Sequence, residues 1–155
     1  MHLRRRHLPL ATLVLLATLG ASPAPDTPLA WQPPGAERTV AERLNKPILY
    51  VFTADWCAPC HQLKRKVFND PVHAKHIAER FYPVEVQDLR RENGRNTPEV
   101  AEVIRRYGVS TLPTLLVATP DGTELDRLKG YAGVDPTVEF LDLQHRKALL
   151  TLGSV

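Results

Sequence analysis

The feature that most constrains this chain is a short motif, Trp56-Cys57-Ala58-Pro59-Cys60, which closely follows an apolar stretch over residues 48–53. Its cysteines are the only two in 155 residues. With two residues between them, one helical turn brings both sulfurs together. A buried strand followed by such a pair at the start of a helix is the arrangement used in thiol–disulfide exchange.

The motif assigns different roles to its two cysteines. The attacking species in exchange is a thiolate. Unpaired N–H groups and the positive end of the helix dipole favour the thiolate of Cys57 at the helix N-terminus. Cys57 is therefore the predicted nucleophile, and Cys60, one turn later, is the predicted resolving thiol. Pro59 fits the first turn, where its missing N–H costs nothing.

Charged and aromatic residues flank this pair. Positive charge follows along the same helix at His61, Lys64, Arg65 and Lys66, and we interpret it as a solvated basic face rather than a cluster that tunes the thiolate. Trp56, beside the nucleophile, is expected to shield the disulfide from water.

Residues 1–21 read as an export signal. Three arginines and no acid precede an uncharged, mostly apolar run at residues 8–19, and small residues follow at Gly20, Ala21 and Ser22. The run is shorter than the roughly 20 residues that span a bilayer. We expect cleavage, a periplasmic or otherwise exported protein, and no stable membrane insertion afterwards; an uncleaved anchor is the alternative.

The charge balance argues against nucleic acid as a partner. Without Arg4, Arg5 and Arg6, the 20 basic residues fall to 17, equal to the 17 acidic ones. The basic character therefore belongs largely to the signal and does not indicate a nucleic-acid or acidic-membrane surface. An exported chain meets an oxidising compartment, but a two-residue loop stabilises little, which disfavours a purely structural disulfide.

The remainder is predicted to form a Pro-rich flexible spacer at 22–35 and one α/β domain at 36–155. Apolar periodicity, turn residues and helix caps predict alternating elements. Helices are expected at 37–45, 57–68, 72–80 (capped by Asp70), 97–107 and 135–149, strands at 48–53, 82–87, 114–118 and 124–129, and a polar loop at 88–96.

Two segments together resemble the thioredoxin superfamily: residues 54–60, which hold the cysteine motif, and residues 107–114, Tyr-Gly-Val-Ser-Thr-Leu-Pro-Thr. The resemblance covers roughly residues 36–150. With the run at 67–72, it is similar to the exported branch typified by the C-terminal periplasmic domain of the electron transporter DsbD. It implies a thioredoxin fold, a central mixed β-sheet with helices on both faces.

The resemblance also implies a substrate-binding surface. It identifies Leu112-Pro113 as a cis-proline site that faces the cysteines, with a backbone that pairs with bound substrate. The implied substrate-binding residues are Trp56, Ala58, Pro59, Thr111, Leu112 and Pro113. One position departs from the family pattern: Val51 stands where many thioredoxins carry a buried acid that assists proton transfer. Water or another acid, such as Glu85, is left to substitute.

The resemblance and Pro59 favour a reductase. Ala58-Pro59 resembles the Gly-Pro of reducing thioredoxins more than the Pro-His of the oxidant DsbA. Client proteins with cysteines or disulfides, a DsbD-type membrane electron donor and a monomeric state are expected, with no metal and no cofactor beyond the Cys57–Cys60 disulfide.

Three other readings stay open. The first is a disulfide oxidase or isomerase that uses the same pair. The second is c-type haem attachment through the C-x-x-C-H string ending at His61. The third is Cu(I) handling by two thiolates. A binding module with idle cysteines is disfavoured by the intact pair.

Overall fold

A computed structural model describes residues 29–153; the predicted signal peptide and the first part of the predicted spacer lie outside this range. The elements, in chain order, are α1 (Glu37–Leu44), β1 (Ile48–Thr53), α2 (Ala58–Leu63), the π-helix η1 (Lys64–Phe68), α3 (Pro71–Arg80), β2 (Tyr82–Gln87), α4 (Arg90–Asn93), α5 (Pro98–Tyr107), β3 (Thr114–Ala118), β4 (Glu124–Lys129) and α6 (Val134–Leu152).

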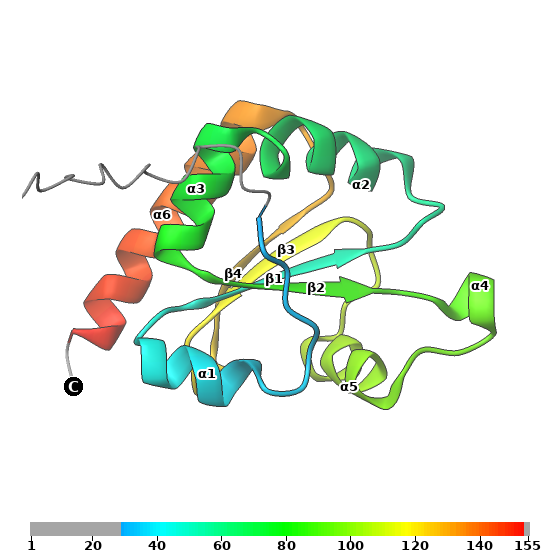
Figure 1. Cartoon of the computed structure of the whole chain (residues 1–155), viewed down its shortest axis with the longest axis horizontal. Helices are drawn as coiled ribbons and strands as arrows, with labels where there is room; N and C mark the ends of the chain where they lie inside the picture. Colours follow the sequence, from blue (N-terminus) through cyan, green and yellow to red (C-terminus); the bar gives the residue numbers. More distant parts are fainter. Residues whose placement is uncertain (1–28, 154–155) are drawn as a thin grey trace, which may run out of the picture.

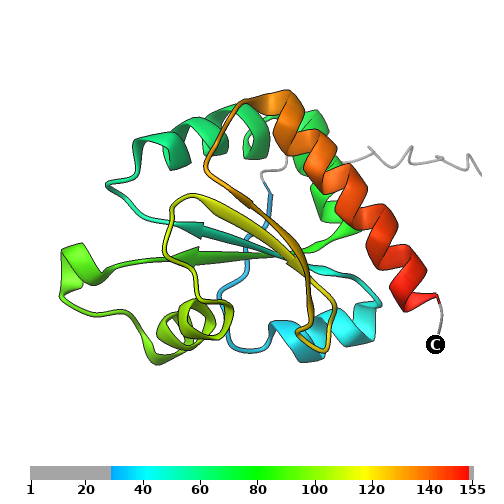
Figure 2. The same cartoon turned by 180° about the vertical axis from the view of Figure 1, so that it is seen from behind.

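The strands form one mixed sheet in the order β2-β1-β3-β4. β1 pairs with β2 in parallel, and the β1–β3 and β3–β4 pairs are antiparallel. Helices α2, α3 and α6 cover one face of the sheet, and α1 and α5 cover the other (Figures 1 and 2). The chain therefore has the thioredoxin fold that the resemblance implied.

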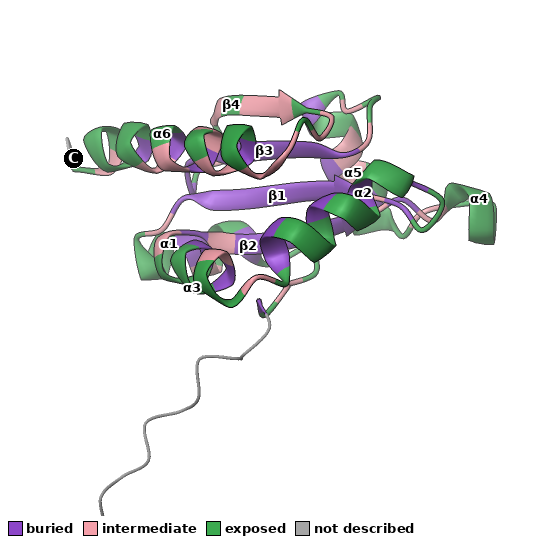
Figure 3. Cartoon of the chain, turned by 90° about the horizontal axis from the view of Figure 1, so that it is seen from above, coloured by how far each residue is buried: buried purple, intermediate pink, exposed green. Residues whose placement is uncertain are grey.

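β1 explains why the chain needs helices on both faces. Leu49 and Val51 belong to the core under α2, α3 and α6, whereas Tyr50 and Phe52 belong to the core over α1 and α5. Successive side chains of a strand point to opposite faces, so an apolar run without polar gaps must be covered twice. Figure 3 shows β1 in the colour of buried residues, between β3 and β2; only Thr53, at its end, is partly exposed.

Three predicted elements differ in detail. The predicted helix at 57–68 is not uniformly α-helical, because its second half is η1, closed by a bond from the Asn69 N–H to the Lys64 carbonyl at 2.8 Å. The predicted loop at 88–96 contains α4, which Gly94 ends with a φ of 71°. α6 starts at Val134 and runs to Leu152, so Asp135 lies inside the first turn and does not cap it.

Residues 29–35 also depart from the predicted flexible spacer. Leu29 is buried, and Trp31 packs edge-on against Phe68 of η1 with ring centroids 4.9 Å apart. Gln32 forms a parallel bridge with Val84 of β2. The many prolines suggested an unpaired chain, but the apolar side chains of Leu29 and Trp31 gain more by covering the open edge near β2 than by staying in water.

Candidate active site

The end of β1 positions the cysteine motif. After Thr53 the chain turns, and the Cys57 N–H donates to the Ala54 carbonyl at 3.1 Å. Cys57 then takes the N-cap position of α2, with extended backbone angles. Its Sγ accepts a hydrogen bond from the Cys60 N–H at 3.3 Å. That donor is one of the N–H groups a helix leaves unpaired at its start, so it would also stabilise a Cys57 thiolate.

Cys57 and Cys60 form a disulfide, with an S–S distance of 2.03 Å and Cα atoms 5.2 Å apart. Both residues are nearly covered, at 3% and 4% exposure. Ala58 and Pro59, between them, are exposed, and Pro59 lies in the first turn of α2. The disulfide therefore lies just under the surface, below the exposed first turn of α2.

A distant loop closes over the pair. The Leu112-Pro113 peptide bond is cis, as the resemblance implied. Leu112 packs against the small buried cluster of Ala54, Cys57 and Cys60. Thr111, beside it, is exposed. The fold thus brings residues from two segments more than 50 positions apart to one site.

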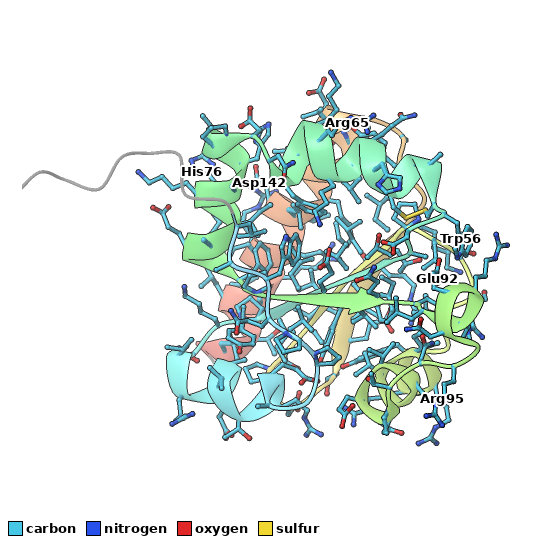
Figure 4. The ribbon with its side chains drawn as sticks, turned by 45° about the vertical axis from the view of Figure 1, so that its right-hand side comes forward. Trp56, Arg65, His76, Glu92, Arg95 and Asp142 are labelled. Carbon is cyan, nitrogen blue, oxygen red and sulfur yellow. A yellow bond between two sulfur atoms is a disulfide. The ribbon has the colours of Figure 1, made fainter. Side chains whose placement is uncertain are left out.

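Trp56 forms the rim of this site. It is 44% exposed, and the guanidinium carbon of Arg91 lies 3.7 Å from the centroid of its ring. A cavity of about 90 Å³ lies beside it, lined in part by Leu112 and Phe52. Figure 4 shows Trp56 at the α4 edge of the molecule, with Glu92 and Arg95 on that edge and Arg65 on the active-site helix above.

Hydrogen bonds fix the loop that carries Trp56. The Gln87 side-chain amide donates to the Asp55 carboxylate at 2.7 Å. The His61 ring reaches the Asp55 carbonyl at 2.7 Å, so its Nε2 carries the hydrogen and donates. Sequence analysis missed both contacts, because His61 was interpreted only as part of a basic face or as the last residue of a possible haem attachment string. They tie the start of α2 to the end of β2.

A second network holds α4 in place. The buried Asp88 carboxylate accepts from the Arg90 guanidinium at 2.6 to 3.1 Å and from the Asn96 side chain at 3.0 Å. These bonds, those to Arg90 foremost, lower the pKa of Asp88 to about 2. The Asn96 oxygen accepts from the Leu89 N–H. Asp88 and Asn96 therefore clamp the two ends of the α4 segment together, which the polar composition of 88–96 did not reveal.

The buried position under α2 at which many thioredoxins carry an acid is occupied here by Val51. Val51 is 3% exposed and belongs to the apolar core cluster that includes Leu63. Glu85 is its partner across the β1–β2 pair, but its carboxylate binds Lys64 Nζ at 3.3 Å. The nearest acid on this strand pair is thus held by a lysine and lies partly in solvent.

A larger hollow than the one beside Trp56 lies elsewhere. A cleft of about 920 Å³ is lined by α1, α5, the β3–β4 turn and the end of α6, with no cysteine among its residues. Over residues 29–153, no three His, Cys, Asp or Glu side chains are placed to hold a metal ion. Within the same range no helix is long and apolar enough to cross a bilayer.

Comparison with known proteins agrees with the fold. The family model of the thioredoxin-like domain matches residues 35–144, which include both cysteines and the cis-proline loop. The chain belongs to the thioredoxin-like family. By structure it is similar to a thioredoxin from Thermus thermophilus, with a TM-score of 0.62 and 26% identity over 83% of this chain and 92% of that one.

A second group of relatives is formed by DsbD proteins. The thiol:disulfide interchange protein DsbD of Neisseria meningitidis is 29% identical over 107 residues, 68% of this chain. This thioredoxin-like chain spans only 17% of that protein's length. The oxidised C-terminal domain of Neisseria meningitidis DsbD is similar in structure, with a TM-score of 0.53 and 29% identity over 70% of this chain and 89% of that domain.

Proposed function

We propose that this chain is an exported thiol–disulfide oxidoreductase that reduces disulfides of client proteins through a Cys57–Cys60 dithiol. One observation carries the proposal: Cys57 caps α2 with its sulfur on the Cys60 N–H, and Leu112 of the cis-proline loop packs on the same pair. The neighbouring loop is exposed at Thr111, where a client backbone could approach.

The proposed reaction has two exchange steps. The Cys57 thiolate attacks one sulfur of a client disulfide, forming a mixed disulfide and releasing one client thiolate. The Cys60 thiolate then attacks Cys57, which forms the Cys57–Cys60 disulfide and releases the second client thiolate. Two electrons pass to the client, so a dithiol donor must restore the reduced state. A DsbD-type membrane protein is the proposed donor, because DsbD proteins are among the relatives.

Geometry disfavours the haem and copper readings. The cavity beside Trp56 is not lined by either cysteine and holds about 90 Å³, well below the roughly 300–1,000 Å³ typical of ligand pockets such as one for haem. The His61 ring is already engaged with the Asp55 carbonyl. The strand–turn–helix setting and the family match support exchange chemistry instead.

Single-cysteine variants test the proposal. Reduced Cys60→Ser should capture a disulfide-containing client such as insulin as a mixed disulfide that reducing agent releases, because the resolving thiol is gone. Cys57→Ser should capture far less, because the remaining thiol, Cys60, lies one turn further along α2 and is not at the N-cap, where unpaired N–H groups stabilise a thiolate. Intact-mass analysis under non-reducing conditions measures both. Equal capture by the two variants would refute the assignment of Cys57 as nucleophile.

A further inference from the structure

The α4 segment supplies a charged group beside the disulfide that the exchange steps do not use. Arg91 is exposed and lies over the face of Trp56, 3.7 Å from the ring centroid, and Trp56 directly precedes Cys57. In the described part of the chain, Arg91 has no carboxylate or carbonyl acceptor. Stacking uses the face of the guanidinium and leaves the N–H groups at its edge available.

The position of Arg91 is fixed from both sides. Asp88, Arg90 and Asn96 lock the base of α4 through the hydrogen bonds described above. The Gln87–Asp55 bond locks the loop that carries Trp56. A cation held in this way loses less side-chain entropy when it binds a ligand than a free surface arginine does.

Basic side chains outnumber acidic ones in the segments that flank the disulfide, although the exposed Asp55 carboxylate, bound by the Gln87 amide, adds one acid beside Trp56. From Ala58 to Phe68 there is no acid, and Arg65 and Lys66 are exposed with no ion pair within residues 29–153. On the other side, Arg91 and Arg95 outnumber Glu92, the only acid of α4, while Arg90 is neutralised by Asp88. A polypeptide laid across the pair therefore meets more basic than acidic side chains in these two segments.

We infer that Arg91 is a specificity-determining residue that binds the carboxylate of an acidic side chain next to the reactive disulfide of a client protein. This inference rests on the proposed exchange function and adds a preference among clients. An arginine can bind a carboxylate through two parallel N–H bonds. The Trp56 ring supports the planar guanidinium of Arg91 from one side. Because Trp56 directly precedes Cys57, a carboxylate bound to Arg91 lies near the reacting sulfurs.

Matched peptide substrates test the inference on the full mature protein. Two disulfide peptides would differ only by Glu or Gln next to the reactive cysteine. Trp fluorescence follows the oxidation of the reduced protein by each peptide and gives the second-order rate constant. We expect the wild type to favour the Glu peptide by about three- to tenfold at low salt, with the ratio falling as salt screens the contact.

Variants distinguish a direct contact between Arg91 and the peptide carboxylate from a general effect of the protein's positive charge. Arg91→Gln should bring the Glu/Gln ratio close to one, and Arg91→Lys, which keeps the charge but loses the fork, should give an intermediate ratio. Arg146→Gln, which removes the same charge from an exposed position on α6, should leave the wild-type ratio unchanged. A ratio that survives Arg91→Gln, or that falls equally in Arg146→Gln, would overturn the inference.

A neutral substrate distinguishes this failure from failure of the proposed function. Hydroxyethyl disulfide carries no charge, and its reduction by the wild type reports the chemistry alone. If the wild type reduces hydroxyethyl disulfide, and reduces the Glu and Gln peptides at the same rate, the specificity inference is wrong and the exchange function stands. If no disulfide is reduced, the exchange function itself fails and the specificity inference fails with it.

Discussion

At the scale of single residues, polar side chains hold the loop that leads into the disulfide. Cys57 and Cys60 form the disulfide, and the Asp55 carboxylate two residues before Cys57 accepts a hydrogen bond from the Gln87 side chain. The sequence does not reveal the contacts of His61, Gln87 and Asp88, because the type of a polar residue does not tell which partner its side chain binds. Only the folded chain brings Gln87 to Asp55.

Asp88 is the residue whose charge matters most for the α4 segment. Its pKa is lowered to about 2 by hydrogen bonds, those from Arg90 foremost. A carboxyl group with a lowered folded-state pKa stabilises the fold above its unfolded pKa, near 4, and that contribution is lost as the pH falls toward 2. Asp88→Asn should therefore lower the free energy of unfolding at pH 7 by about 2 kcal/mol.

The pH dependence of the stability difference tests the role of the Asp88 charge, and a second variant serves as control. The difference between wild type and Asp88→Asn should shrink as the pH falls below about 4. Glu139→Gln, at an exposed position of α6, should change stability by less than about 0.5 kcal/mol. Urea unfolding across pH measures both. A difference that stays constant from pH 7 to pH 3 would contradict the assigned role of the Asp88 charge.

At the scale of elements, helix ends were predicted well where a side chain marks them. Asp70 and Pro71 predicted the start of α3, and Asp70 accepts from the Val72 and His73 N–H groups at 3.0 Å each. η1 and α4 were missed because no local composition distinguishes a π-turn from an α-turn, or a four-residue helix from a loop. The packing of residues 29–35 was missed because it depends on a distant edge of the sheet.

The Asp70 cap can be measured directly. Asp70→Ala should lower the free energy of unfolding by about 1 kcal/mol, because two N–H groups at the start of α3 lose their acceptor. Asp70→Asn, which keeps a side-chain oxygen, should recover most of that loss. Chemical denaturation of the three proteins tests the cap. Equal stability of the Ala and Asn variants would show that the hydrogen bonds contribute little.

The segment before α1 is predicted to belong to the folded domain. Trp31→Ala should lower the free energy of unfolding by about 2 kcal/mol, because its ring contact with Phe68 and its cover over the core are lost. Gln32→Ala should cost less than about 0.5 kcal/mol, since its side chain reaches only the Ala30 carbonyl and the backbone bridge remains. Equal effects would contradict the packing.

At the scale of the whole molecule, the two-faced core determines where the chemistry lies. The burial of β1 on both faces fixes the direction of the chain as it leaves the sheet, and the active-site turn follows at that end. The β1–β3 pairing brings the cis-proline loop, which precedes β3, to the same end of the sheet. The alternation of apolar strands and capped helices was enough to predict this architecture. It could not predict the Asp88 clamp or the place of Arg91.

The direction of electron flow is also a property of the whole molecule, because it compares the free energies of the dithiol and disulfide forms. Reference potentials run from about −270 mV for thioredoxin to about −120 mV for DsbA. Ala58-Pro59 favours the reducing end, since it resembles the Gly-Pro of reducing thioredoxins. A reduced pool of this protein in an oxidising compartment then requires a dithiol donor.

Equilibrium redox titration of the mature protein in glutathione or dithiothreitol buffers, followed by Trp fluorescence and checked by thiol alkylation, is the measurement that decides whether this protein is a reductase. The account predicts one two-electron transition for the Cys57–Cys60 pair, near the thioredoxin end of the range. A transition near the DsbA end would contradict the reductase and indicate an oxidase or isomerase. Failure of the two cysteines to titrate at all would contradict the exchange function.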